Sequence, residues 1–134
     1  MYLATGALSA FVAGYTSSKS RQRVSEVSSR LMLYGGANNK VFLGYLTGSE
    51  FDVKSVWNEY GSYGSKFSLN SIWNSASSYG NKYSNYSPWN SMATSPPVIV
   101  DSSGKFYGYF TVNKYYSKRT RIGWIVDVLD KYPL

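Results

Sequence analysis

The ionisable side chains of this sequence leave little room for catalysis. The 134 residues include no His and no Cys. Without these two residue types there is no Ser-His-Asp or Cys-His nucleophile pair, no thiolate chemistry and no zinc site built on Cys. Acid–base chemistry would have to come from the seven carboxylates: Glu26, Glu50, Asp52, Glu59, Asp101, Asp127 and Asp130.

One group of these carboxylates is compact enough in the sequence to suggest a catalytic pair. Glycoside hydrolysis needs two carboxyl groups about 5 to 10 Å apart, and Glu50, Asp52 and Glu59 are the only close cluster. Such a cluster is more often a solvated loop than an active site. It is accompanied by no Asp-x-Asp calcium loop and no His-containing ligand set. We therefore expect a protein that is not an enzyme and that uses no metal or cofactor.

Aromatic and amide side chains form a more informative pattern, which is a 16-residue repeat. Residues 51–66 read FDVKSVWNEYGSYGSK, residues 67–82 read FSLNSIWNSASSYGNK, and the two share eight of sixteen positions. Residues 83–97 keep the aromatic start and the Ser-Pro-Trp-Asn segment, and they end in Pro-Pro. Because Pro cannot donate a backbone hydrogen bond, the series is expected to stop there.

Each repeat predicts short turns that pack through Trp. Ser55 and Ser71 can cap a single turn that holds the following Trp, and the Asn after each Trp can bond nearby backbone. Gly64 and Gly80 can take the positive φ that closes the unit. On this interpretation the three repeat Trp residues are core side chains, and the Asn residues satisfy their own loops.

The same repeats also offer a binding surface. Tyr and Trp give large, rigid contacts and are enriched at interfaces, so the aromatics could contact a partner or a second copy of the chain. In an alternative function, as a carbohydrate-binding module, the rings stack on sugars and the Asn side chains bond hydroxyl groups. The candidate binding residues are Trp57, Asn58, Tyr60, Tyr63, Trp73, Asn74, Tyr79, Tyr83, Tyr86, Trp89 and Asn90.

The net charge of +7 is concentrated in two basic clusters. A solvated face is the simpler interpretation, and contact with nucleic acid or another anionic polymer is the alternative. No nucleic-acid-binding motif accompanies the charge, which makes nucleic acid the less favoured partner. The candidate anion-binding residues are Lys19, Arg21, Arg23, Lys114, Lys118, Arg119 and Arg121.

Two related segments on either side of the repeats predict β-hairpins. Residues 41–47 (VFLGYLT) resemble residues 105–111 (KFYGYFT), and their glycines are 64 positions apart. An apolar run and a turn precede each segment, at 31–34 and at 98–100. This is a hairpin signal, and two hairpins can combine into one four-stranded antiparallel sheet. The repeats would then form an excursion from that sheet.

Apolar residues at helical spacing predict a helix near each end of the chain. Near the C-terminus, Ile122, Ile125, Val126 and Leu129 follow an i, i+3, i+4, i+7 pattern. The apolar N-terminus is too short for a membrane span of about 20 residues, and it lacks the positive start of a secretory signal; an ordered helix is favoured there, with the remnant of a leader as the alternative. We predict one α+β domain over 1–134, with a helical segment at 1–30, a hairpin at 31–50, repeats at 51–97, a hairpin at 98–115 and a helix at 120–132.

The repeat and hairpin motifs together resemble a known group of sequences. The matching text is KVFLGYLTGSEF, SVWNEYGSYGSK, SIWNSASSYGNK, SPWN and GKFYGYFTVNKY, which covers about residues 40–115. It resembles uncharacterised bacterial proteins, often exported, with tandem Ser-Ile/Val-x-Asn-x-Tyr-Gly-x-Tyr-Gly units flanked by Gly-Lys-Phe-x-Gly hairpins. The resemblance implies a bacterial or phage setting and export, and it carries no known activity.

The surface composition favours the same location. Charged residues make up only 16% of the chain, against about 25% in an ordinary soluble protein, and Ser, Gly, Asn and Tyr supply most of the polarity. We therefore expect an extracytoplasmic structural or interaction protein that associates with itself or with a surface partner.

Overall fold

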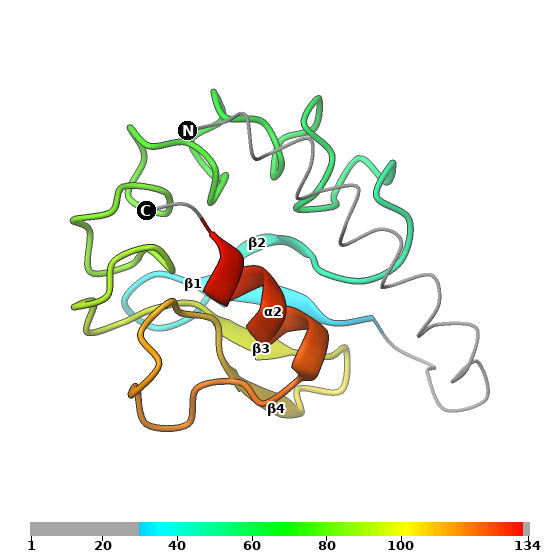
Figure 1. Cartoon of the computed structure of the whole chain (residues 1–134). Coiled ribbons are helices and arrows are strands. Elements are labelled where there is room, and N and C mark those ends of the chain that lie inside the picture. The colour runs from blue at the N-terminus through cyan, green and yellow to red at the C-terminus, as the bar shows by residue number, and fades with distance from the viewer. Residues whose placement is uncertain (1–29, 133–134) are drawn as a thin grey trace.

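The regular secondary structure consists of two hairpins and one helix. The computed structural model describes residues 30–132, and the helix expected over 1–30 lies outside them (Figure 1). The elements are β1 (Met32–Gly35), β2 (Val41–Tyr45), β3 (Val98–Val100), β4 (Phe106–Tyr109) and α2 (Gly123–Lys131). Both predicted hairpins and the predicted C-terminal helix are confirmed. The helix ends at Lys131, because Tyr132 is extended, as is usual before a Pro.

The four strands form one antiparallel sheet in the order β2-β1-β3-β4. Its centre is the pair Leu33 and Ile99, whose side chains are both fully buried. The flanking pairs are Met32 with Val100 and Tyr34 with Val98. Since the two hairpins meet through their first strands, an approximate two-fold axis passes through the central pair. The sheet thus joins the two related segments of the sequence.

Glycines at equivalent places let the outer strands contact the chain that follows them. Gly44 and Gly108 have φ of 117° and 103°, a region that favours glycine. A Cβ on Gly108 would lie 2.5 Å from the Cα of Thr120. Directly after these glycines, β2 forms a parallel bridge to Ser55 and β4 forms one to Arg119. The two related segments of the sequence therefore also follow the same backbone path.

Between the hairpins, residues 49–96 wind as a succession of tight turns. The backbone N–H at each corner donates to the carbonyl of the corner before it, as from Ser55 to Asp52 (2.9 Å) and from Ser77 to Asn74 (3.0 Å). In the first two periods, four turns of three residues and one of four make up the 16 residues, and in the third the three-residue turns end at Ala93. We call these periods the first coil (49–64), the second coil (65–80) and the third coil (81–96). They arch from β2 to β3 above α2 (Figure 1).

Side-chain oxygens brace these corners. Ser71 Oγ accepts the N–H of Trp73 (3.0 Å), and Asn74 Oδ1 accepts the N–H of Ala76 (2.9 Å). Such Asx and ST turns close a backbone corner without help from distant residues. The same bond forms at Ser49, Asp52, Ser55, Asn58, Ser65, Ser68, Ser77, Asn81, Ser84, Ser87 and Asn90. The capping role expected for Ser55 and Ser71 is thus confirmed.

Gly64 and Gly80 are needed for a reason other than the one the sequence suggested. The prediction of a positive φ at these two residues is wrong, since neither is among the glycines with positive φ. A Cβ on Gly64 would instead overlap the backbone of Asn58, and one on Gly80 would overlap the backbone of Asn74. The close approach of two backbone segments within one coil excludes any side chain at these positions.

The sheet, the coils and α2 share one hydrophobic core. From α2 the buried residues are Trp124, Ile125, Val128 and Leu129. They belong to the same cluster as Leu33 and Ile99 of the sheet and Phe110 after β4. Large apolar side chains from segments far apart in the sequence therefore hold the coils on the sheet.

Asp101 closes the turn between β3 and β4. Its carboxylate accepts hydrogen bonds from the hydroxyl of Ser103 (2.6 Å), the hydroxyl of Tyr107 (2.8 Å), and the backbone N–H groups of Ser103 (2.9 Å) and Lys105 (3.1 Å). These bonds favour the ionised form. They lower the pKa of Asp101 from 3.8 to about 2, with the Ser103 hydroxyl as the largest cause.

This shift predicts a loss of stability in acid. Because the folded-state pKa lies below the unfolded one, the contribution of Asp101 is complete above about pH 4 and is lost as the pH falls toward 2. The melting temperature should fall across this window, and the fall should be smaller in Asp101→Asn. Thermal unfolding of both proteins between pH 5 and pH 2 checks this. Parallel pH profiles for the two proteins would contradict it.

Candidate functional site

The three Trp residues of the repeats are core side chains. Trp57, Trp73 and Trp89 are 6%, 2% and 2% exposed. Each indole N–H donates to a backbone carbonyl in the preceding part of the chain, namely Leu46 (2.9 Å), Val56 (2.7 Å) and Ile72 (2.5 Å), respectively. The second and third of these bonds link one coil to the coil before it. The Trp residues thus stack the coils in register, and they are removed from any surface site.

The Trp rings also form a column, which Tyr132 closes directly after α2. The centroids of Trp57 and Trp73 lie 5.8 Å apart, and those of Trp73 and Trp89 lie 5.2 Å apart. Tyr132 stacks on Trp89 at 3.8 Å, with the ring planes 10° apart. Aromatic side chains that pack in this way bury a large apolar area. The side chain that follows the last turn of α2 therefore holds the third coil.

The Asn residue after each Trp is used within its own coil. In addition to the corner bond, the side-chain amide of Asn74 donates to the carbonyl of Ser68 (2.9 Å), and that of Asn90 donates to the carbonyl of Ser84 (3.0 Å). Asn58 makes longer bonds of the same kind, at 3.3 Å, to Phe51 and Asp52. Because both ends of each amide are engaged, these side chains serve the fold as internal staples.

The candidate Tyr residues fall into two groups. Tyr60 and Tyr83 are 91% and 79% exposed, whereas Tyr63, Tyr79 and Tyr86 are half-buried. Tyr63 packs edge-on against Phe42 of β2, with centroids 4.9 Å apart, and Tyr79 belongs to the side chains packed on the core. Of the candidate binding residues, Tyr60 and Tyr83 are therefore the most available to a partner.

The structure adds two exposed rings, Phe51 and Phe67, to the candidate Tyr83, and the three form one aromatic row. Phe51, Phe67 and Tyr83 occupy the same place in successive coils and are 80%, 81% and 79% exposed. Lys66 lies over Phe67 and Lys82 lies over Tyr83, each with Nζ 5.4 Å from the ring centroid. We call these three rings the outer row. Their 16-residue phase was the signal that could have found them.

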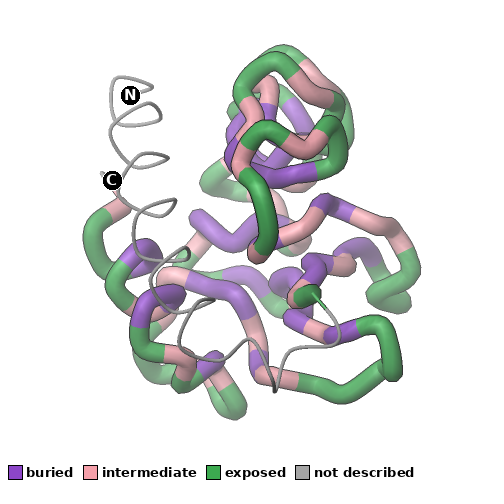
Figure 2. Tube along the Cα trace, turned by 90° about the vertical axis from the view of Figure 1, so that its right-hand side faces the viewer, coloured by how far each residue is buried: buried purple, intermediate pink, exposed green. Residues whose placement is uncertain are grey.

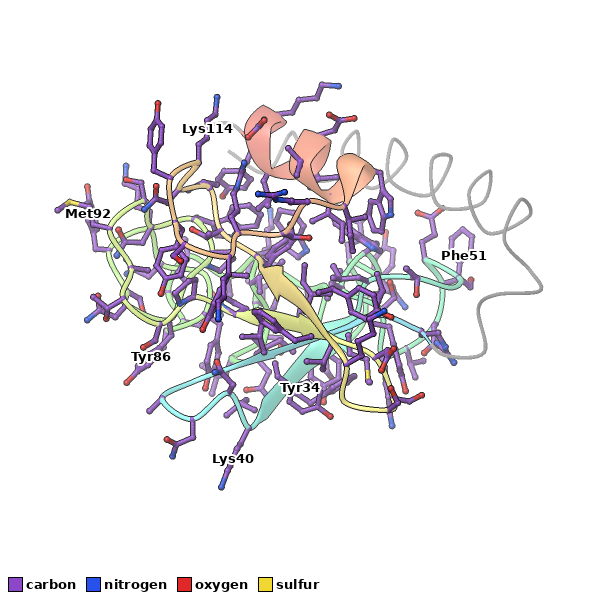
Figure 3. The ribbon with its side chains drawn as sticks, turned by 90° about the horizontal axis from the view of Figure 1, so that it is seen from below. Tyr34, Lys40, Phe51, Tyr86, Met92 and Lys114 are labelled. Carbon is purple, nitrogen blue, oxygen red and sulfur yellow. The ribbon has the colours of Figure 1, made fainter. Side chains whose placement is uncertain are left out.

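Further apolar side chains lie beside the outer row or elsewhere on the coils. Val53 and Leu69, on the next turn, are 71% and 76% exposed, and Met92 is 83% exposed. The coils, viewed nearly end-on in Figure 2, have exposed residues on their outer side. Figure 3 shows Phe51 projecting at one end of the coils and Met92 at the other. The outer side of the coils therefore exposes apolar side chains among neutral polar ones.

The outer row has an equivalent after the second hairpin. Tyr115 is 94% exposed, and it lies two residues after Asn113, whose Oδ1 accepts its backbone N–H (2.9 Å). Corner bonds continue from Tyr116 to Asn113 (3.2 Å) and from Arg119 to Tyr116 (3.0 Å). The turn geometry of the coils thus recurs in this segment.

One member of the basic cluster within the described residues is already engaged in the fold. Lys114, Lys118 and Arg121 are exposed, but Arg119 donates to Asp130 (2.9 Å) and to the carbonyl of Thr111 (2.9 Å). Arg119 therefore fastens the segment after β4 to α2. The other cluster, Lys19, Arg21 and Arg23, lies outside the described residues.

The carboxylate cluster at the start of the coils has a structural use. Arg30 lies over the ring of Tyr45, 4.1 Å from its centroid, and donates to Asp52 (2.8 Å). The backbone N–H of Lys54, first, and the Arg30 guanidinium lower the pKa of Asp52. Within residues 30–132, no three acidic side chains gather closely enough to hold a metal ion, and no helix is long and apolar enough to cross a membrane.

The geometry defines a small α+β protein whose candidate site is the outer side of three stacked coils. No family model matches the chain, no curated protein matches it, and no solved structure matches it. The function of the candidate site is therefore inferred from its own side chains alone.

The core role of the Trp column leads to a prediction on stability. Trp73→Ala should destabilise the protein by about 3 to 5 kcal/mol, because it leaves a cavity between the coils and removes the link to Val56. Tyr60→Ala is the matched control, and its change should stay within about 0.5 kcal/mol. Denaturant unfolding measures both. A small effect of Trp73→Ala would contradict the core assignment.

Proposed function

We propose that this chain is a non-catalytic interaction protein that binds a partner through the outer side of its coils. The observation that carries this proposal is the outer row, in which three rings about 80% exposed recur in phase. Single exposed apolar residues are ordinary, but grouped ones are typical of interaction sites. Aromatic residues are also enriched where binding energy is concentrated.

The internal chemistry of the coils supports the same proposal. Ser and Asn side chains already satisfy the coil backbone, and Trp side chains fill its core, as the corner bonds and the indole bonds illustrate. At the outer-row positions, the corner bonds use the backbone N–H and not the ring. Selection for contact with another molecule explains why the rings are aromatic.

Carbohydrate binding is the second candidate. The outer row places one ring on each coil at a regular interval, and a linear glycan likewise has sugars at regular intervals. The rings that would stack on sugars are those of the outer row, since Trp57, Trp73 and Trp89 are buried. We place the protein outside the cytoplasm in either case, on the basis of its low share of charged residues.

Replacing the outer row tests the proposed function. A variant with Phe51→Ser, Phe67→Ser and Tyr83→Ser should keep its melting temperature within a few degrees, because these side chains are exposed. The wild-type chain should self-associate, or sediment with chitin, cellulose or phosphatidylglycerol vesicles, at least tenfold more strongly than the variant. Light scattering and co-sedimentation measure this. Equal behaviour of the two proteins in every assay would contradict the proposal.

A further inference from the structure

The apolar surface of the coils is densest on the first two of them. Phe51 and Val53 on the first coil are 80% and 71% exposed, and Phe67 and Leu69 on the second coil are 81% and 76% exposed. On the third coil the equivalent residues are Tyr83 and Asn85. The four apolar side chains therefore form a patch with two equivalent halves. We call it the apolar patch.

The two halves of this patch have the same internal arrangement. Phe51 and Phe67 each follow a Ser corner that accepts their backbone N–H, from Ser49 Oγ (3.1 Å) and Ser65 Oγ (3.1 Å). The coils are stacked in register by the Trp73 indole bond to Val56. A half-turn about an axis between the two coils would therefore bring Phe onto Phe and Val onto Leu. Such a surface is self-complementary, as a two-fold dimer interface requires.

The charge pattern selects the antiparallel orientation. The first coil has three acids (Glu50, Asp52 and Glu59) against one lysine, and Arg30 pairs with Asp52, which leaves a net charge of −1, whereas the second coil has Lys66 alone, a net charge of +1. Facing first coil to first coil would oppose like charges. Facing first coil to second coil opposes unlike charges on both sides of the axis. An anionic polymer or an anionic lipid surface would instead meet the acids of the first coil.

We propose that the apolar patch is the contact surface for a second copy of this chain, packed antiparallel with first coil against second coil. The inference rests on the proposed function and names its partner. The Phe rings alone offer roughly 300 Å² per chain, and the neighbouring Val, Leu and Lys stems extend this toward the low end of specific interfaces. We expect a reversible dimer with a dissociation constant in the micromolar range.

The first experiment measures mass against concentration. Sedimentation equilibrium of the full chain from about 1 to 500 µM should show a monomer–dimer transition. Phe67→Ser should weaken the dimer at least tenfold, since it removes one ring from each half of the symmetric interface. Tyr115→Ser is the matched control, because Tyr115 is also strongly exposed, at 94%, but lies outside the three coils, and it should leave the transition unchanged.

The second experiment tests the orientation, and it uses the absence of cysteine from the chain. Val53→Cys and Leu69→Cys variants, one of them carrying a size tag, are mixed in equal amounts and oxidised with oxidised glutathione. The antiparallel dimer predicts that the mixed disulfide forms several-fold faster than either homodimer. Dominance of the Val53→Cys homodimer would overturn the proposal.

The remaining outcomes separate this proposal from the proposed function. A chain that stays monomeric at every concentration overturns the dimer. If that monomer still sediments with chitin or with phosphatidylglycerol vesicles, and loses this with Phe67→Ser, the proposed function holds with a different partner. A monomer that binds none of these overturns both. Thermal unfolding of each variant ensures that losses come from the surface.

Discussion

The coils depend on one recurring kind of local hydrogen bond, in which a backbone N–H donates to the side-chain oxygen two residues before it. Ser71 and Asn74 make this bond at adjacent corners of the second coil. Because each corner is closed locally, the chain can turn every three residues without strand pairing or a helix. Backbone groups that would otherwise need water or a neighbouring strand are satisfied within the coil. Replacement of Ser or Asn by residues without such an oxygen would leave the coil without its bracing.

The Trp column packs these local turns together into one stable structure. Trp73 and Trp89 each donate to the coil before them, and Tyr132 covers the end of the column. Because different residues form the inside and the outside of the coils, the outer residues are not fixed by the fold. Ser, Asn, Gly and Trp specify the inside and the path, so that the first and second turns of each coil can vary freely on the outside. The outer row has exposed rings at such positions.

Much of this architecture could be predicted from the sequence because it is local or duplicated. The paired motifs around Gly44 and Gly108 predicted two hairpins, and the structure joins them in one sheet. The capping by Ser55 followed from its place before Trp57. The reason for Gly64 could not be predicted, because it depends on how closely the chain returns to Asn58. The candidate site was selected by residue type, which favoured Trp, whereas exposure depends on the three-dimensional winding that brings Phe67 outside.

The central claim is that corner oxygens and Trp bonds hold the coils while the outer side stays available for binding. Amide hydrogen exchange of the full chain, followed by nuclear magnetic resonance, tests it most directly. The account predicts slow exchange with a three-residue period over 49–96, in which the amides of Asn74 and Ala76 are protected and that of exposed Ser75 exchanges faster. Uniformly fast exchange, or protection without this period, would contradict the account.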